Sequence, residues 1–211
     1  MDVITAIKKE RGKYRVTIND AEDVLVPVSL MRERPLSEGQ PIDLEDYDNW
    51  LMLRQYRFAL DRAVGYLAAR ACSTREIEQK LLRAGYRPST VEMVIYKLQR
   101  ENLLDDADFA RQWVESRQHH KLGRSRIAQE LRRKGISQEE AEDALSVIDD
   151  EDQLSGAVAL AEKAAARVKP GEDMRKAASR IAGMLARRGY SWDVAKQAIA
   201  QALSDENVNY D

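Results

Sequence analysis

Apolar residues recur with a helical period over most of the chain. The pattern Ile-x-x-x-Leu-x-x-x-Gly occurs at residues 77–85, 127–135 and 181–189. After each glycine the apolar residues follow the i, i+3, i+4, i+7 spacing of an amphipathic helix. These positions are Val91, Val94, Ile95 and Leu98; then Ala141, Ala144, Leu145 and Ile148; then Ala195, Ala198, Ile199 and Ala202. Because both patterns return about every 50 residues, the sequence predicts tandem helical repeats.

Each of these glycines is expected to end one helix and to let the next one begin. Glycine adopts, without steric cost, the left-handed backbone that closes a helix C-terminus. Capping boxes are expected at Ser73 with Glu76 and at Ser137 with Glu140. A further apolar helix precedes each pair, so each repeat should contain three helices. Its apolar residues are Leu60, Val64 and Leu67; Phe109, Ala110, Trp113 and Val114; and Leu160, Ala161 and Ala164.

The N-terminal residues follow another pattern. β-branched residues flank the polar segment KKERGK, and VLVPV follows the turn-like NDAED, so two or three short strands are expected. Pro27 favours an edge position for the last of them, and residues 34–48 are expected to be a linker. The predicted fold is mainly α, with a small β-strand extension at residues 1–45 and three-helix repeats at residues 57–105, 106–153 and 154–204. The repeats are expected to fold without the extension.

Composition narrows the class of protein. The chain has 211 residues, of which 44% are hydrophobic and 33% charged, which suits one or two domains with cores of their own. The first residues lack the features of a signal or transit peptide, and no apolar run of about 18 residues occurs, so we expect a cytoplasmic protein with no membrane segment. Cys72 is the single cysteine, so no intrachain disulfide can form.

No arrangement of residues indicates catalysis. Asp105 and Asp106 could form an acid pair or bind a metal, but capping of the following helix is the better interpretation. His119 and His120 point about 100° apart on a helix and cannot easily share a metal. Cys72 has no histidine or lysine beside it in the sequence, so an unreactive thiol is expected. We therefore expect no metal, no cofactor and no enzymatic activity.

Charge is unevenly distributed although the net charge is only −2. Residues 111–134 contain eight Lys or Arg and two acidic residues, whereas residues 137–153 contain eight acidic residues and no Lys or Arg. Basic residues also precede the corner glycine of every repeat. Such residues complement the dipole of a helix C-terminus by about 0.3 to 1 kcal/mol, which alone would account for them. Their recurrence favours a surface for a partner.

One segment, ENLLDDADFARQWVESRQHHKLGRSRIAQELRRKGI at residues 101–136, carries a specific pattern. Its members are Leu104, Asp105, Asp106, Phe109, Ala110, Gly123, Arg126, Ile127, Glu130, Leu131, Lys134, Gly135 and Ile136. This pattern resembles that of the RecX family of bacterial regulators of the RecA recombinase, and the resemblance covers about residues 57–203. Asn102 stands near where the family usually has glycine, but asparagine also tolerates a left-handed backbone.

The resemblance implies a partner and a mode of action. It implies that the repeats form an elongated, curved array in the groove of the RecA filament on single-stranded DNA, where they depress its recombinase, ATPase and co-protease activities. Basic side chains of the array would pair with acidic groups of RecA or with DNA phosphates. The candidate partner-binding residues are Arg83, Arg117, Lys121, Arg124, Arg126, Arg132, Arg133, Lys134, Arg187 and Arg188.

An alternative function remains open from the sequence. A helical-repeat protein could bind DNA independently of RecA, but the third helix of the second repeat is acidic and does not suit a DNA recognition helix. A steep salt dependence of DNA binding would favour this alternative. We expect a monomer with at most weak direct contact to DNA.

Overall fold

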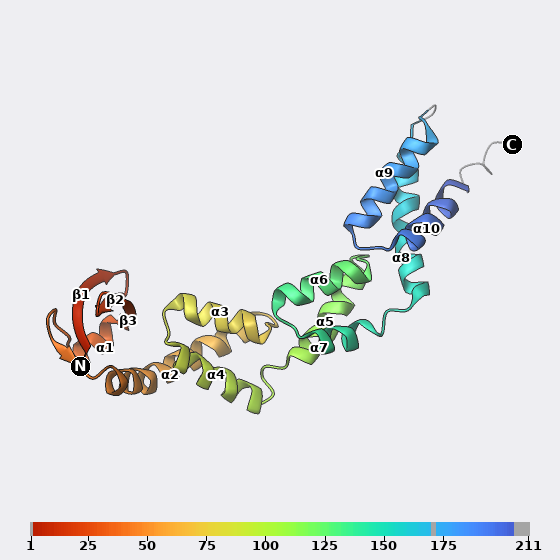
Figure 1. The fold of residues 1–211 in the computed structure, drawn as a ribbon. Helices are drawn as coiled ribbons and strands as arrows, with labels where there is room; N and C mark the ends of the chain where they lie inside the picture. The colour runs from red at the N-terminus through yellow and green to blue at the C-terminus, as the bar shows by residue number, and fades with distance from the viewer. Residues whose placement is uncertain (1, 170–171, 205–211) are drawn as a thin grey trace. The chain divides into compact units, whose positions relative to one another are not determined.

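A computed structural model describes residues 2–169 and 172–204 of the chain (Figure 1). It divides into two compact units, Met1–Asp105 and Asp106–Asp211. The fold is mainly helical, with three-helix repeats after a small N-terminal sheet, which confirms the predicted class.

The N-terminal sheet of the first unit has four antiparallel strands in the order β3-β2-β1-β4. They are β1 (Asp2–Glu10), β2 (Lys13–Ile18), β3 (Glu22–Pro27) and β4 (Pro41–Ile42), and the short helix α1 (Val28–Glu33) follows β3. The edge position predicted for β3 is confirmed. The expectation of a plain linker at residues 34–48 is wrong at β4, because a two-residue strand is too short to leave a periodic pattern in the sequence, and it is wrong from Leu44 onward, where helix α2 (Leu44–Ala69) begins.

Helix α2 (Leu44–Ala69) belongs to both parts of the first unit. Its first half contributes Tyr47 and Leu51 to the core of the sheet, and its second half contributes Ala59 and Ala63 to the core of the first repeat. The predicted stripe at this helix is wrong at Val64, which is 42% exposed, whereas Leu60 and Leu67 are partly buried against the core of the first repeat. Small residues take the buried positions because α2 packs closely on the third helix of the repeat.

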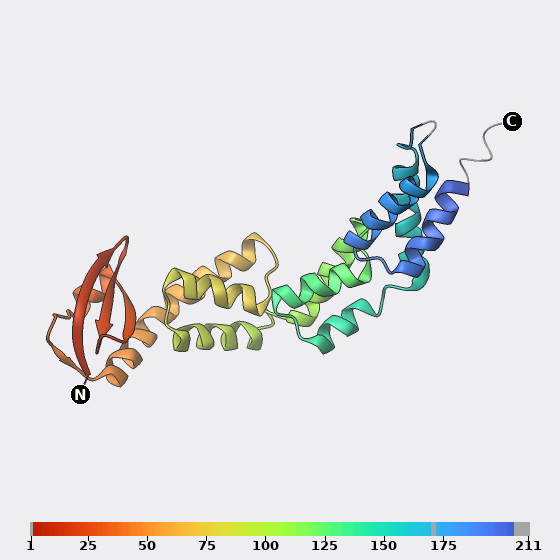
Figure 2. The same cartoon turned by 45° about the horizontal axis from the view of Figure 1, so that its top comes forward.

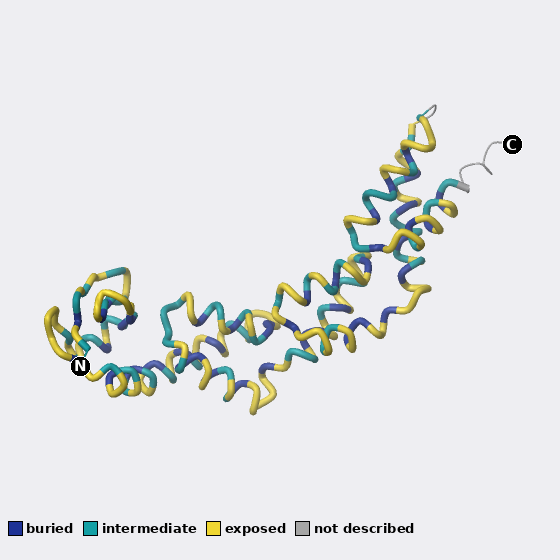
Figure 3. Tube along the Cα trace, viewed as in Figure 1, coloured by how far each residue is buried: buried dark blue, intermediate teal, exposed yellow. Residues whose placement is uncertain are grey.

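The remaining helices form the rest of the three repeats (Figure 2). They are α3 (Thr74–Ala84) and α4 (Pro88–Arg100); α5 (Asp106–His119), α6 (Arg124–Lys134) and α7 (Gln138–Leu145); and α8 (Asp150–Ala165), α9 (Met174–Arg187) and α10 (Trp192–Ser204). Each repeat has a hydrophobic cluster of its own. Figure 3 shows buried and exposed residues in turn along each helix, as amphipathic elements require.

The corner of each repeat has the backbone that the sequence predicts. Gly85, Gly135 and Gly189 have φ values of 92°, 85° and 91°. The amide of the residue after each glycine donates to the carbonyl of the buried leucine in the last helical turn, the six-to-one bond of a Schellman motif. Both predicted capping boxes form at the starts of α3 and α7. Asn102 has φ 54°, so the turn that replaces the family glycine is retained.

Polar contacts tie the sheet to the first repeat. The Arg87 guanidinium, 17% exposed, donates to Glu22 of β3 at 3.2 Å and to Asp48 of α2. The Arg87 backbone amide donates to the side chain of Gln55, whose own amide group donates to Leu25 O at 3.5 Å. The domain division at residues 45 and 57 stays a prediction, but α2 runs through both of these positions.

Candidate interaction surface

The exposed face of α6 concentrates positive charge. Ile127 and Leu131 turn inward to the core of the second repeat, and this leaves Arg132 and Arg133 exposed on the opposite side. The Gln129 Oε1 atom accepts hydrogen bonds from Arg126 Nη1 at 3.4 Å and from Arg133 Nη2 at 3.1 Å. One neutral acceptor therefore holds two guanidinium groups on the same face.

A close contact between the second and third repeats brings Arg187, an exposed residue of α9, to the edge of this face. The Gly123 amide donates to Arg188 O at 2.8 Å, and the Ser125 amide donates to Gly189 O at 3.3 Å. Amides at the N-terminus of α6 therefore bond to carbonyls at the C-terminus of α9. The positive end of one helix dipole lies against the negative end of the other. We call Arg126, Arg132, Arg133 and Arg187 the basic corner.

The contact requires glycine on both sides. A Cβ atom at Gly123 would lie 2.3 Å from Gly189 O, and a Cβ atom at Gly189 would lie 2.3 Å from Arg126 N. These distances are far below van der Waals contact with backbone atoms that cannot move independently. The Gly-x-x-Arg-Ile pattern at residues 123–127 thus has a packing reason as well as a capping one.

Other basic candidates serve an internal cluster. Arg117 Nε donates to Glu130 Oε2 at 2.7 Å, and Trp113 Nε1 donates to the same oxygen at 3.2 Å. The Arg117 guanidinium and Lys134 Nζ each lie 3.9 Å from the centroid of the Trp113 ring. Burial would raise the pKa of Glu130, but the hydrogen bond and charge of Arg117 outweigh burial and hold this pKa below its ordinary value of 4.5.

The structure therefore distinguishes among the residues that the sequence grouped together. Lys134, which the sequence placed among the partner-binding candidates, is half-buried against the rings of Phe109 and Trp113. Arg124 donates to Ile148 O, and Arg188 donates to His120 O at 3.1 Å, so both help to join neighbouring elements. Lys121 is exposed.

In the first unit, Arg83 is exposed on α3 and donates to Gln79 at 3.0 Å. Cys72 has no lysine beside it in the sequence, but the fold brings one near, and its low reactivity stays a prediction. Lys80 Nζ lies 3.4 Å from Cys72 Sγ, because two turns of α3 bring the lysine back over the buried thiol.

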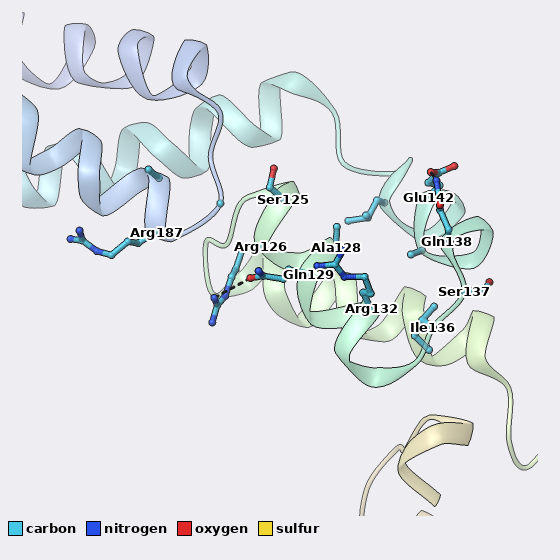
Figure 4. A pocket seen from close by; sticks show the side chains of 14 residues that line it. Ser125, Arg126, Ala128, Gln129, Arg132, Ile136, Ser137, Gln138, Glu142 and Arg187 are labelled. Atoms are coloured by element: carbon cyan, nitrogen blue, oxygen red, sulfur yellow. Dashed lines mark hydrogen bonds between the residues drawn. The ribbon is translucent and has the colours of Figure 1, made fainter. Parts of the chain in front are cut away.

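Sequence reasoning missed the groove that the basic corner borders. Arg126, Arg132 and Arg187 line a groove of about 640 Å³ together with apolar residues of α6 and α7 (Figure 4). The sequence pattern places Ala141 and Leu145 in the core stripe of α7 and gives no sign that they also border a groove. An alignment of the repeats on one another could have indicated the site, because positions that border the groove change in charge and polarity from one repeat to the next.

Neither a metal site nor a membrane segment is found in the described part of the chain. Within residues 2–169 and 172–204, no three His, Cys, Asp or Glu residues lie where they could hold a metal ion. Across the same residues, no helix is long and apolar enough to span a membrane.

Comparison with known proteins gives concordant matches. Family models match three segments: RecX, first three-helix domain, at residues 59–98; RecX, second three-helix domain, at residues 105–145; and RecX, third three-helix domain, at residues 150–199. Regulatory protein RecX of Mycobacteroides abscessus is 35% identical over 191 residues, which is 90% of this chain and 88% of that protein. Regulatory protein RecX of Prosthecochloris aestuarii is 35% identical over 150 residues, or 71% of this chain and 96% of that protein.

Solved structures are similar too. A crystal structure of regulatory protein RecX matches with a TM-score of 0.66 and 25% identity, covering 95% of this chain and 100% of that chain. A crystal structure of RecX from Lactobacillus salivarius matches with a TM-score of 0.65 and 27% identity, covering 71% of this chain and 97% of that chain.

Proposed function

Since this chain belongs to the RecX family of regulatory proteins, we propose that it is a non-enzymatic regulator of RecA. It binds the RecA filament on single-stranded DNA and lowers the recombinase, ATPase and co-protease activities of RecA. Its action is in the cytoplasm, together with RecA. The observation that carries the proposal is the match of all three three-helix domains in tandem.

The basic corner is proposed as a contact surface where the middle repeat meets the third. Arg132 and Arg133 are exposed, and Arg126 is partly exposed. A guanidinium group pairs with a carboxylate through two parallel hydrogen bonds, so arginine suits an acidic protein surface better than lysine does. The corner is held by Gln129 and by the junction of two repeats, which limits the entropy lost when a partner binds.

The primary experiment is co-sedimentation with RecA filaments. RecA is assembled on single-stranded DNA with a slowly hydrolysed ATP analogue, and the amount of this protein in the pellet is measured. Inhibition of RecA ATP hydrolysis is measured in parallel with ATP. Binding to the filament together with inhibition supports the proposal, and absence of both refutes it.

A charge-reversed variant tests the basic corner. Arg132→Glu combined with Arg133→Glu should weaken inhibition at least tenfold, about 1.4 kcal/mol, because like charges then face the partner. Lys134 is left unchanged because it packs on Trp113. The helical circular dichroism spectrum should stay native, since both altered side chains are exposed.

The matched control reverses acidic residues on the neighbouring helix. Glu139→Lys combined with Asp143→Lys changes two exposed residues of α7. Glu140 is avoided because it forms the capping box, and Glu142 is avoided because it lines the groove. The control should inhibit as well as the parent. If the Arg132→Glu and Arg133→Glu variant inhibits RecA as well as the parent does, these arginines act only on the dipole of their own helix and do not contact the partner.

Binding to DNA alone is the competing explanation. The parent protein is titrated with a single-stranded oligonucleotide at several salt concentrations. Contacts to several phosphates would give a steep decrease of affinity with salt. A steep decrease without filament-specific binding would favour the DNA-binding alternative.

A further inference from the structure

The groove beside the basic corner has an apolar floor. It is formed by Ala128 of α6, by Ile136 at the corner, and by Ala141 and Leu145 of α7. The volume of about 640 Å³ lies within the range of about 300 to 1,000 Å³ that is usual for ligand pockets. Apolar side chains of a partner can therefore be buried here.

The two sides of the groove differ in charge. Figure 4 shows Arg132 on the α6 side, and Gln138 and Glu142 on the α7 side. Gln138 Nε2 donates to Glu142 Oε1 at 2.7 Å, which occupies part of the hydrogen-bonding capacity of that carboxylate. In the same view the Arg187 side chain points away from Arg132, so Arg126 and Arg132 are the arginines nearest to an occupant of the groove.

This lining fits a peptide better than a nucleic-acid backbone. A phosphate chain would pair with the arginines, but it would gain nothing from the apolar floor and would be repelled by Glu142. A peptide segment with an apolar side chain and an adjacent carboxylate uses both features. The apolar group fills the floor between Ala128 and Leu145, and the carboxylate reaches Arg132.

The same groove recurs in the first repeat with other side chains. It lies between α3 and α4, has a volume of about 280 Å³, and is lined by Glu78, Leu82, Val91 and Ile95 among others. These residues stand 50 positions before Ala128, Arg132, Ala141 and Leu145. The first repeat therefore forms the same helix pair with Glu78 and Leu82 at the positions that Ala128 and Arg132 occupy in the second repeat. The basic lining of the second groove is not a requirement of the fold.

We propose that the α6–α7 groove receives a segment of the partner protein in which an apolar side chain lies next to Asp or Glu. This inference rests on the proposed function, and it names the chemistry of the RecA surface that the middle repeat recognises. The matching groove of the first repeat, with Glu78 and Glu92 on its border, does not fit the same segment.

Photocrosslinking identifies the occupant. A benzophenone amino acid replaces Gln138 at the border of the groove, and in a second variant it replaces Glu115, an exposed residue of α5 that does not line the groove. After irradiation with RecA filaments, the joined peptides are identified by mass spectrometry. The variant at residue 138 should crosslink to a RecA segment with Asp or Glu within two residues of a large apolar residue.

A repeat-swap variant tests the lining. Ala128→Glu combined with Arg132→Leu gives the second groove the residues of the first at these two positions. The helical spectrum should be unchanged, and affinity for the filament should fall at least tenfold. The reciprocal changes in the first repeat, Glu78→Ala with Leu82→Arg, should not produce this loss. Unchanged affinity of the first swap overturns the proposal.

The outcomes separate this inference from the proposed function. Filament binding with crosslinks to DNA, or to a segment without carboxylates, overturns the groove proposal and leaves the regulator intact. If the parent does not bind filaments, the proposed function fails, and the groove is tested with a synthetic amphipathic peptide of Leu and Glu. If the peptide shifts the amide resonances of Ala128, Ala141 and Leu145, the groove proposal is supported. These shifts should be absent in the swap variant, and absent when the Glu residues of the peptide are replaced by Lys. Absence of shifts in the parent protein with the Leu and Glu peptide overturns the groove proposal.

Discussion

At the scale of single residues, the position of Glu130 determines which of the neighbouring basic side chains are bound within the fold. Its carboxylate accepts from Arg117 and Trp113, and Arg126 Nε lies 3.4 Å from its other oxygen. The carboxylate is 18% exposed, so solvent screens these interactions only partly. Arg117 is held against Trp113 as a result, and Arg132 and Arg133 provide the exposed positive charge of α6.

The Glu130→Gln substitution should lower the free energy of unfolding by about 1 to 3 kcal/mol at pH 7, because it removes the charged acceptor of Arg117. The folded-state pKa of Glu130 is depressed below 4.5. The stabilisation is thus complete above the ordinary pKa and is lost as pH falls through the folded-state pKa. Urea unfolding of parent and variant at pH 7, 5 and 3 should show a difference that shrinks at acidic pH. The exposed Glu115→Gln is the control, and a pH-independent difference would contradict the ion-pair explanation.

Glycine substitutions at two positions of the same repeat should act in opposite directions. Gly189→Ala should lower the free energy of unfolding by at least about 1 to 2 kcal/mol. Alanine is strained in the left-handed backbone conformation of this residue, and its Cβ atom would clash with Arg126 N. Gly183→Ala lies within α9, and its nearest contact would be Arg187 Nη1 at 3.5 Å. It should be neutral or stabilise by up to about 1 kcal/mol. Thermal unfolding measures both, and equal effects would refute the close contact between the repeats.

At the scale of elements, helix α2 joins two cores that the sequence pattern separates. Its buried residues Tyr47 and Leu51 face the sheet, and Ala59 and Ala63 face the first repeat. Arg87, at the start of α4, adds ion pairs to Glu22 and Asp48. The sheet therefore supports the first repeat, and the expectation that all repeats fold without it needs refinement.

Truncation should separate the two units. A chain of residues 106–211 should unfold cooperatively on its own, because its repeats have their own clusters and share backbone hydrogen bonds. A chain of residues 44–105 should melt at a lower temperature than residues 1–105, since Tyr47 and Leu51 lose their cover. Circular dichroism melts of the three fragments measure this. Equal melting of the two N-terminal fragments would show that the sheet does not support the repeat.

At the scale of the whole molecule, charge is segregated although it nearly cancels in total. The net charge is −2, with 34 Lys and Arg against 36 Asp and Glu. Four of the ten basic candidates, Arg117, Arg124, Lys134 and Arg188, make contacts within the fold, so the external positive charge of this region is smaller than the sequence suggests. Electrostatic steering then comes from local surfaces such as the basic corner and depends on ionic strength.

Salt should weaken filament binding through the basic corner. Affinity of the parent for RecA filaments should fall between about 50 and 300 mM salt, because exposed ion pairs are screened over a Debye length of about 10 Å at 0.1 M. The Arg132→Glu and Arg133→Glu double variant should bind more weakly at low salt and vary less with salt. Co-sedimentation across this range measures both proteins. Parallel salt curves would show that these arginines take no part in binding.

The sequence by itself determined the local features of this protein. Helix period, the left-handed glycine corners, the capping boxes and the left-handed Asn102 all depend on interactions within a few residues along the chain. Such interactions leave a pattern at fixed spacing, and the tandem repetition made the pattern recognisable. The family could be inferred for the same reason.

Only the tertiary structure decided which basic residues are available and where they gather. Arg117 meets Glu130 across 13 residues, and Arg124 meets Ile148 across 24. The Gly123–Gly189 contact and the groove of the second repeat likewise join segments from different helices. These pairings depend on how packed helices approach one another, and no local spacing encodes that distance. A charge pattern alone therefore cannot separate an arginine that holds the fold from one that meets a partner.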